Sequence, residues 1–519
     1  MSAEATSGTT GMKRTLGLTG VTVNAMALIA PGAFLWITFQ VQAAQTLPGG
    51  GPSTAMDIWP GIFFALILAF LTALSYAELA RIYPEAGTGS SYYFAERSFL
   101  DKEDKRHHKW ARIAKLATGW AAHLYYWVYP GVMVAFMAII VNYMLGLFGI
   151  QIGQIGQIVV AIVFAGLVGF IAVRGVTGST TTALVINVIQ LVSLVGFSAL
   201  AIAYRVANPD HATFVFSSPA DVVLPHDLFS TFAQGTIAIL ILVGFETATA
   251  FGAEAKNVKR DIPRAVILAL VIQGLFAYLF EYFAANFALS DKLVGTAADG
   301  KTALTGFDAA AASSAPIGDM VQQIGNSMLG GTGFALTVVV GVTVIIAILG
   351  TTLSAMNTGV RVTFAMAQDT EMPGLLGLLH GKYATPHFGV LAMVIVSGLI
   401  GIVGTFSVVT LTGITLASNL GTFALYGLTC LVTVVAFLGH KEFAVLKHIV
   451  VPVLGLLANL AMLVTIFALG FIGGGDAQTE SFMALGIAGA WFVLSVAYVA
   501  MHRKPSVAGR PLVARTGTQ

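Results

Sequence analysis

Two long intervals without a charged residue constrain this chain more than any other feature. Residues 116–173 and 383–440 contain no Asp, Glu, Lys or Arg. A helix that crosses a bilayer needs roughly 20 apolar residues, so each interval is long enough for two crossings. Lipid-facing backbone must satisfy its own hydrogen bonds, which restricts spanning segments to helices or closed barrels. Because the apolar runs are continuous rather than alternating, both intervals predict pairs of membrane-spanning helices.

The composition of the whole chain agrees with an integral membrane protein. Of its 519 residues, 57% are hydrophobic and only 10% are charged, whereas soluble domains carry about 25% charged residues. This balance excludes a soluble enzyme, a nucleic-acid binder and a disulfide scaffold. The formal net charge of +2 suggests no polyanionic partner, and the single cysteine, Cys430, cannot form an internal disulfide.

Charges, turn residues and hydropathy divide the chain into twelve expected helices. All Lys and Arg except Arg205, Lys292 and Lys301 fall on the side of the two termini. Because positive loops stay in the cytoplasm, both termini are expected there, in a multi-pass protein of the cytoplasmic membrane. The expected helices cover residues 16–45, 58–80, 116–148, 152–173, 181–204, 229–253, 264–289, 333–366, 388–405, 409–438, 448–472 and 481–501.

Two of the expected helices are interrupted near their middle. The first contains Pro31-Gly32, where proline removes a backbone donor and glycine weakens the helix further. The sixth contains Gly244 close to Glu246, a carboxyl that is costly at mid-membrane unless it is protonated, paired or hydrated. A simple kink would explain either feature alone. The two lie five helices apart, however, as in a five-plus-five inverted repeat, and this spacing predicts a small-molecule site between them.

Three stretches resemble one family. Residues 73–93 (ALSYAELARIYPEAGTGSSYY) are similar to the second-helix signature of the amino acid–polyamine–organocation (APC) superfamily. Residues 244–264 (GFETATAFGAEAKNVKRDIPR) resemble its sixth helix, and residues 357–386 (NTGVRVTFAMAQDTEMPGLLGLLHGKYATP) resemble its eighth helix and the following loop. Together with the twelve helices, the resemblance extends over residues 15–500.

The resemblance implies an all-α integral membrane fold of LeuT-like type, with twelve helices of which the first and sixth are broken. Residues 16–438 would form a ten-helix transport core and residues 439–502 two peripheral helices, between cytoplasmic tails at 1–15 and 503–519. It also implies secondary active transport by alternating access of a substrate that carries an amino group and usually a carboxylate. No enzymatic activity is expected.

The same resemblance implies a set of substrate contacts. Backbone N–H groups at the start of a half-helix suit a carboxylate, and freed carbonyls suit an ammonium group. Apolar residues near the breaks would surround the substrate side chain, with Phe245 helping to close the site. The expected N–H donors belong to Gly32, Ala33 and Phe34 after Pro31, the carbonyls to Leu28, Val243 and Gly244, and the apolar contacts to Leu240, Phe245 and Ala355.

Two interpretations of cation coupling remain open. Glu246 matches a glutamate of the arginine/agmatine antiporters and could carry a proton, which we favour. Alternatively, the hydroxyls of Thr351 and Thr352 could join carbonyls of the first helix around a sodium ion, because oxygen ligands suit a hard cation. Many proton-coupled relatives have a lysine in the fifth helix, but this chain has none between residues 181 and 204, where Ser193 lies near that place. No cofactor is expected beyond a bound proton or Na⁺.

Other functions fit the sequence less well. A transporter or exchanger of polyamines or other amines would keep the fold and bring a second ammonium group to Glu246. A channel normally needs a continuous polar lining, and an intramembrane enzyme needs a catalytic constellation. The sequence shows only scattered hydroxyls, and its histidines fall mostly in loops. Its expected partners are therefore the lipid bilayer and a small amino acid or amine, with the oligomeric state left open.

Overall fold

The computed structural model describes residues 15–29, 31–47, 53–102, 109–174, 180–213, 219–252, 254–276, 283–297 and 300–502. Within these ranges the side chains of residues 31–34 are not described. The expected tails at 1–15 and 503–519 lie outside the described residues apart from Thr15.

Helices make up nearly all of the described chain. The long ones follow the apolar runs, and short 3₁₀ segments and one hairpin connect them. The helices are α1 (Leu18–Ile29), α2 (Pro31–Ala44), α3 (Ile58–Ile82), α4 (Ser91–Leu100), α5 (Lys109–Leu147), α6 (Gly153–Val173), α7 (Thr180–Ala207), α8 (Leu228–Leu242), α9 (Val258–Leu270), α10 (Phe283–Ala288), α11 (Gly306–Ala312), α12 (Pro316–Met328), α13 (Gly333–Gln368), α14 (His387–Gly404), α15 (Val408–Phe437), α16 (Val451–Ile472) and α17 (Gly475–Met501). The 3₁₀ helix η5 (Phe245–Phe251) continues α8, the π-helix η6 (Val271–Leu275) continues α9, and β1 (Val294–Thr296) pairs antiparallel with β2 (Ala303–Thr305).

The prediction of an apolar all-helical protein is confirmed in its coarse form. Among the described residues, ten helices are long and apolar enough to cross a membrane. The first and seventh expected helices, 16–45 and 264–289, are not among the ten. Each is divided by residues outside the described ranges, at Ala30 and at 277–282. Twelve crossings therefore remain a prediction.

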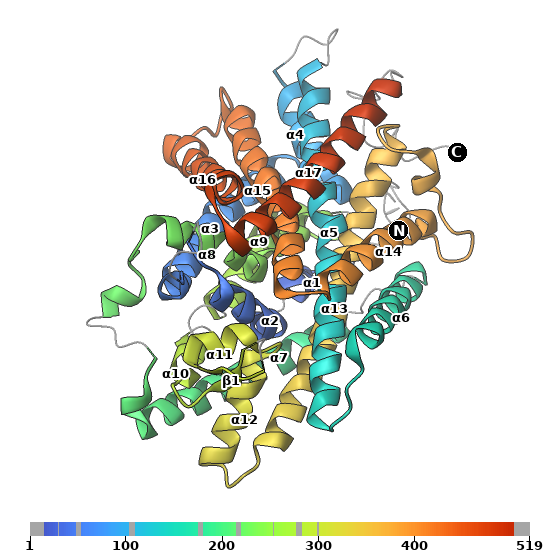
Figure 1. Ribbon diagram of the computed structural model, residues 1–519. Coiled ribbons are helices and arrows are strands. Elements are labelled where there is room, and N and C mark those ends of the chain that lie inside the picture. The colour runs from blue at the N-terminus through green and yellow to red at the C-terminus, as the bar shows by residue number, and fades with distance from the viewer. Residues whose placement is uncertain are drawn as a thin grey trace, which may run out of the picture.

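The long helix α5 occupies the centre of the assembly. It packs against α4, α6, α13, α14 and α15, and Figure 1 shows it running through the middle of the bundle. The short helix α1 packs against α7, α9, α13 and η5, and α2 packs against α7, α8, α11, α12 and α13. The two parts of the first expected helix thus share α7 and α13 and differ in their other neighbours.

Large apolar side chains cover the outside of several helices. Val163 and Phe170 of α6 and Phe492 and Val493 of α17 are more than half exposed. Such a surface is unfavourable in water, but in a bilayer it contacts acyl chains. These exposed faces and the ten apolar helices describe a multi-pass membrane protein.

A polar layer caps one end of the bundle. The helices α10, α11 and α12 gather there with the hairpin, at the lower end of the view in Figure 1. Asp319 of α12 accepts hydrogen bonds from Tyr143 of α5 (2.9 Å) and from Ser313. Partial burial raises the pKa of the Asp319 carboxyl above its ordinary value. Gly318 lies so close to Trp36 and Tyr143 that an added Cβ would come within 2.7 Å of both, so α12 fits tightly over α2 and α5.

A charged cluster fixes the end of α13 at the opposite side. Lys115 is fully buried on α5. Its ammonium lies 2.9 Å from Asp369 and 3.3 Å from Glu96, and one turn earlier Arg112 binds both oxygens of Glu371. Because buried charges are tolerated only when paired, this cluster locks the segment after α13 onto α5 and α4.

Candidate functional site

The first expected helix is described as two helices on either side of Ala30, which lies outside the described residues. Helix α1 is described to Ile29 and α2 from Pro31. The expected N–H donors Gly32, Ala33 and Phe34 fall in the first described turn of α2. Their role as donors to a carboxylate stays a prediction.

The sixth expected helix is also divided. After α8 ends at Leu242, Val243 is extended and Gly244 has φ 128°, before η5 begins at Phe245. A side chain at Gly244 would be strained by that φ and crowded, since its Cβ would lie 2.9 Å from Leu28 Cβ and 3.1 Å from Ile29 N. The break after α8 therefore lies directly against the end of α1.

Glu246 is enclosed by neutral hydrogen-bond donors. Its Oε2 accepts from the Gly244 N–H (2.9 Å) and from the Tyr426 hydroxyl of α15 (2.7 Å), and its Oε1 accepts from the Tyr126 hydroxyl of α5 (3.1 Å). The residue is 2% exposed. The carboxyl thus holds η5 to α5 and α15 and bridges the break at Gly244. The sequence analysis did not identify either tyrosine.

The backbone carbonyls near the break after α8 have hydrogen-bond donors. The Gly244 oxygen accepts from both the N–H (3.0 Å) and the hydroxyl (2.6 Å) of Thr247. The Leu28 oxygen accepts from the Tyr129 hydroxyl at 3.3 Å. Because a carbonyl oxygen has two lone pairs, Leu28 keeps capacity for a further donor, whereas an ammonium group at Gly244 would compete with Thr247. Their role as substrate contacts stays a prediction.

The apolar residues expected around the substrate are all buried. Leu28, Leu240, Val243, Phe245 and Ala355 are 0% exposed. The Phe245 ring packs edge-on against Tyr76 at 6.1 Å and lies 5.3 Å from the Tyr426 ring. These residues are consequently closed off from solvent.

The two threonines proposed for ion coupling have different surroundings. Thr351 of α13 donates to the Ala27 carbonyl of α1 at 3.1 Å. Thr352 donates to Ile348, one turn back in its own helix, at 2.6 Å. Only Thr351 is directed at the first helix, so the structure does not bring the two hydroxyls together on α1.

A salt bridge lies beyond η5. Glu254 accepts from Arg361 of α13 at 2.8 Å. Arg361 also donates to the Ala250 carbonyl at 3.2 Å. Alongside, the hydroxyls of Ser90 and Thr249 are in contact. These contacts tie the far end of η5 to α13 and to the start of α4.

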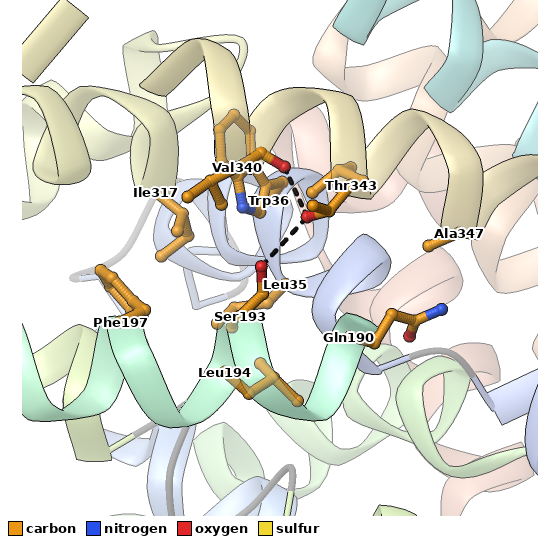
Figure 2. Close-up of a pocket in the computed structure, with 11 residues that line it drawn as sticks. Leu35, Trp36, Gln190, Ser193, Leu194, Phe197, Ile317, Val340, Thr343 and Ala347 are labelled. Atoms are coloured by element: carbon orange, nitrogen blue, oxygen red, sulfur yellow. Dashed lines mark hydrogen bonds between the residues drawn. The ribbon is translucent and has the colours of Figure 1, made fainter. Parts of the chain in front are cut away.

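A small cavity lies apart from these residues. Figure 2 shows it between α2, α7, α12 and α13, where Trp36 and Ser193 are among the lining side chains. None of the residues expected to bind substrate lines it. The breaks and the cavity are thus two separate features of the described part of the chain.

Comparison with known proteins decides the family. A family model described as amino acid permease matches residues 20–508. The chain belongs to the amino acid permease family. The match covers α8, η5, α13, α16 and α17 and most of α1, and it agrees with the resemblance seen in the sequence.

Two curated relatives are similar to parts of this permease. One is the branched-chain amino acid permease BcaP of Bacillus subtilis (strain 168), 24% identical over 250 residues, which are 48% of this chain and 48% of that protein. The other is BcaP of Lactococcus lactis subsp. cremoris (strain MG1363), 30% identical over 167 residues, which are 32% of this chain and 30% of that protein. The chain thus spans about half the length of the first relative and less of the second.

Proposed function

We propose that this protein is a secondary active transporter that carries amino acids across the cytoplasmic membrane by alternating access. The observation that carries the proposal is the packing of Gly244, at the break after α8, against Leu28 and Ile29 at the end of α1, beside the expected interruption at Pro31-Gly32. Helix ends at mid-membrane supply polar backbone groups in a setting that otherwise has none. In this proposal residues 16–438 form the transport core, and α16 and α17 are peripheral.

We infer that the substrate is a neutral, apolar amino acid, with branched-chain amino acids as the first candidates. The names of the two relatives support this choice. The buried lining supports it too, because Leu28, Leu240, Val243, Phe245 and Ala355 offer apolar surface to a side chain. The carboxylate would meet the first turn of α2, and the ammonium group would bind at the Leu28 or Gly244 carbonyl.

An amine without a carboxylate is the alternative substrate. It would use Glu246 as a counter-charge for a second ammonium group. The three neutral donors on Glu246 leave this carboxyl engaged, which favours an amino acid over a diamine. Competition of putrescine with leucine uptake separates the two, and strong competition by putrescine would favour the amine.

Cation coupling is proposed to use a proton on Glu246. Its position between η5, α5 and α15 supports this choice, since a change of charge there would alter three contacts at once. Sodium coupling would use Thr351 with the Ala27 carbonyl. Glu246→Gln should abolish the pH dependence of transport under the proton proposal. Thr351→Ala, with Thr352→Ala as the control that does not reach α1, should abolish sodium dependence under the other.

The proposal is tested by uptake into proteoliposomes. Leucine, isoleucine and valine should show saturable uptake and counterflow, stimulated by an imposed proton or sodium gradient. Gly32→Val should abolish substrate binding by blocking approach to α2, and Phe245→Ala should weaken it by removing apolar contact worth roughly 1.5–3 kcal/mol. Unchanged affinity in both variants would place the substrate elsewhere.

A further inference from the structure

One rim of the bundle carries cations that have no acidic residue nearby in the sequence. The rim is formed by the end of α6 and by the segment 372–386, which connects α13 to α14. The chain contains no Asp or Glu from residue 116 to 209 or from residue 372 to 441. Arg174 and Lys382 are the Arg and Lys of this rim, and both are exposed. Neither has a carboxylate partner among the residues that the structure describes.

The turn that contains Lys382 is attached to the end of α6. Across this turn the His380 N–H donates to the Thr385 carbonyl at 2.8 Å. The Thr385 hydroxyl donates in turn to the carbonyl of Val173, the residue before Arg174, at 2.6 Å. Because these bonds fix the turn against α6, Arg174 and Lys382 belong to one surface although they are far apart in the sequence.

Both cations lie on aromatic rings. The Arg174 guanidinium lies 4.2 Å from the centre of the Phe170 ring, and the Lys382 ammonium lies 5.5 Å from the centre of the Tyr383 ring. A ring face stabilises a cation without accepting its N–H groups as a carboxylate does. The donors of both side chains are therefore available to an anion, and the planar fork of a guanidinium suits phosphate in particular.

Exposed leucines flank these cations. Leu375, Leu378 and Leu379 are each about half exposed, and Leu379 pairs with Pro386 at the base of the turn that contains Lys382. Three exposed leucines in one short segment are unfavourable in water. At the boundary between lipid headgroups and acyl chains, by contrast, leucines contact lipid while neighbouring Lys and Arg side chains reach the headgroups.

The apolar surface continues from the rim along two helices. Helices α6 and α14 lie side by side (Figure 1), so close that a Cβ on Gly169 would come within 2.4 Å of Val394. Both turn large apolar side chains outward, among them Val163, Leu167 and Phe170 on α6 and Leu391, Ile395 and Leu399 on α14. An exposed apolar surface that runs along membrane-spanning helices contacts acyl chains. The phenyl ring under Arg174 is part of this surface.

We propose that this rim is a binding site for an anionic phospholipid. The phosphate would accept hydrogen bonds from Arg174 and Lys382, and the acyl chains would lie along the exposed faces of α6 and α14. Charge selects the occupant, because an anionic headgroup neutralises cations that lack a carboxylate, whereas a zwitterionic headgroup brings its own cation to the same place. The site does not depend on the proposed transport activity.

The headgroup site is tested by native mass spectrometry of the full-length protein in detergent, titrated with phosphatidylglycerol or with phosphatidylcholine of the same acyl chains. Phosphatidylglycerol should bind more tightly. Because one Lys or Arg near an anionic lipid changes the affinity about fivefold, Arg174→Gln and Lys382→Gln should each weaken phosphatidylglycerol binding about fivefold and together about 25-fold. Binding of phosphatidylcholine should not change.

Lys259→Gln is the matched control, because Lys259 is exposed near the start of α9 and lies outside the rim. It should leave phosphatidylglycerol binding unchanged. Equal affinity of the unmodified protein for the two lipids refutes the proposal. So does a loss in Lys259→Gln as large as the loss in Arg174→Gln, since the cations would then act only through the net charge.

A second measurement locates the acyl chains. Phosphatidylglycerol with a photoreactive diazirine in its acyl chain should label peptides of α6 and α14, and the double substitution of Leu378→Ser with Leu379→Ser should lower this labelling. Labelling that is as strong on the exposed faces of α16 and α17 contradicts a site at the rim. Complete displacement of the lipid by inorganic phosphate, together with normal labelling in the leucine variant, would show that the rim binds a soluble anion instead of a lipid.

Discussion

The loss of folding stability on removing the Tyr426 hydroxyl should show whether Glu246 is charged. In the structure this hydroxyl donates to Oε2 at 2.7 Å, the shortest of the three bonds to the carboxyl. A hydrogen bond to a charged group contributes about 1.5–3 kcal/mol, and one between neutral groups about 0.5–1.5 kcal/mol. Tyr426→Phe should therefore cost about 1 kcal/mol more when Glu246 is ionised than when it is protonated, which is roughly a fivefold difference in the unfolding equilibrium.

The assay is a double-mutant cycle of Tyr426→Phe with Glu246→Gln, measured by unfolding in detergent at several pH values. If Glu246 carries the coupling proton, the cost of Tyr426→Phe should be large at alkaline pH, where the carboxylate is charged, and should fall at acid pH. In the Glu246→Gln background, which cannot titrate, the cost should stay small and independent of pH.

Tyr125 provides the matched control. It is 0% exposed beside Tyr126, but its hydroxyl has no hydrogen-bond partner within the described residues. Tyr125→Phe should thus be neutral or slightly stabilising at every pH, because it removes an unpaired polar atom. A cost of Tyr426→Phe that does not change between about pH 5 and about pH 8 would refute a change of charge on Glu246 in this conformation.

Three other substitutions test contacts at the break after α8 and at the two ends of the bundle. Gly244→Ala should lose roughly 2–5 kcal/mol, since it combines backbone strain at φ 128° with a clash against α1, and thermal unfolding of purified protein measures the loss. Lys115→Met should cost about 3–5 kcal/mol by leaving Asp369 and Glu96 buried without their shared cation, and adding Asp369→Asn should recover part of the folded yield. Asp319→Asn should flatten the pH dependence of stability. Because the pKa of Asp319 is raised in the folded protein, its contribution to the free energy of unfolding is complete below about pH 4 and is lost as pH rises. By about pH 7 the variant should therefore have a higher melting temperature than the unmodified protein.

The positions of the helices could be predicted because a helix that crosses a bilayer needs a long apolar segment, and such segments are visible in the sequence. The expected span 152–173 corresponds to α6 at Gly153–Val173, and 388–405 corresponds to α14 at His387–Gly404. A charge beyond one end of each helix, Arg174 or Lys382, and a long charge-free run leave little freedom in where the helix lies. The interruptions at Pro31 and Gly244 were visible for the same reason, since proline and glycine stand out against a background of strong helix formers.

The contacts of the site could not be predicted, because they join residues far apart in the sequence. Tyr126 and Tyr426 look like ordinary apolar-helix residues until the fold brings both to Glu246. Thr351 and Thr352 are adjacent in the sequence, yet a helix separates neighbours by about 100°, so only one faces α1. Composition predicts which segments are helices, but the rotation of each helix depends on packing.

Three side-chain hydrogen bonds attach α1 to its neighbours. Its carbonyls at Val23, Ala27 and Leu28 accept from Asn187, Thr351 and Tyr129, which belong to three different helices. Each such bond contributes about 0.5–1.5 kcal/mol, and apolar packing adds little extra in lipid because acyl chains are as apolar as the side chains they replace. Under the proposed alternating access, a substrate ammonium or a cation that binds these carbonyls would compete with the side-chain donors, and part of its binding energy would favour a change in the position of α1.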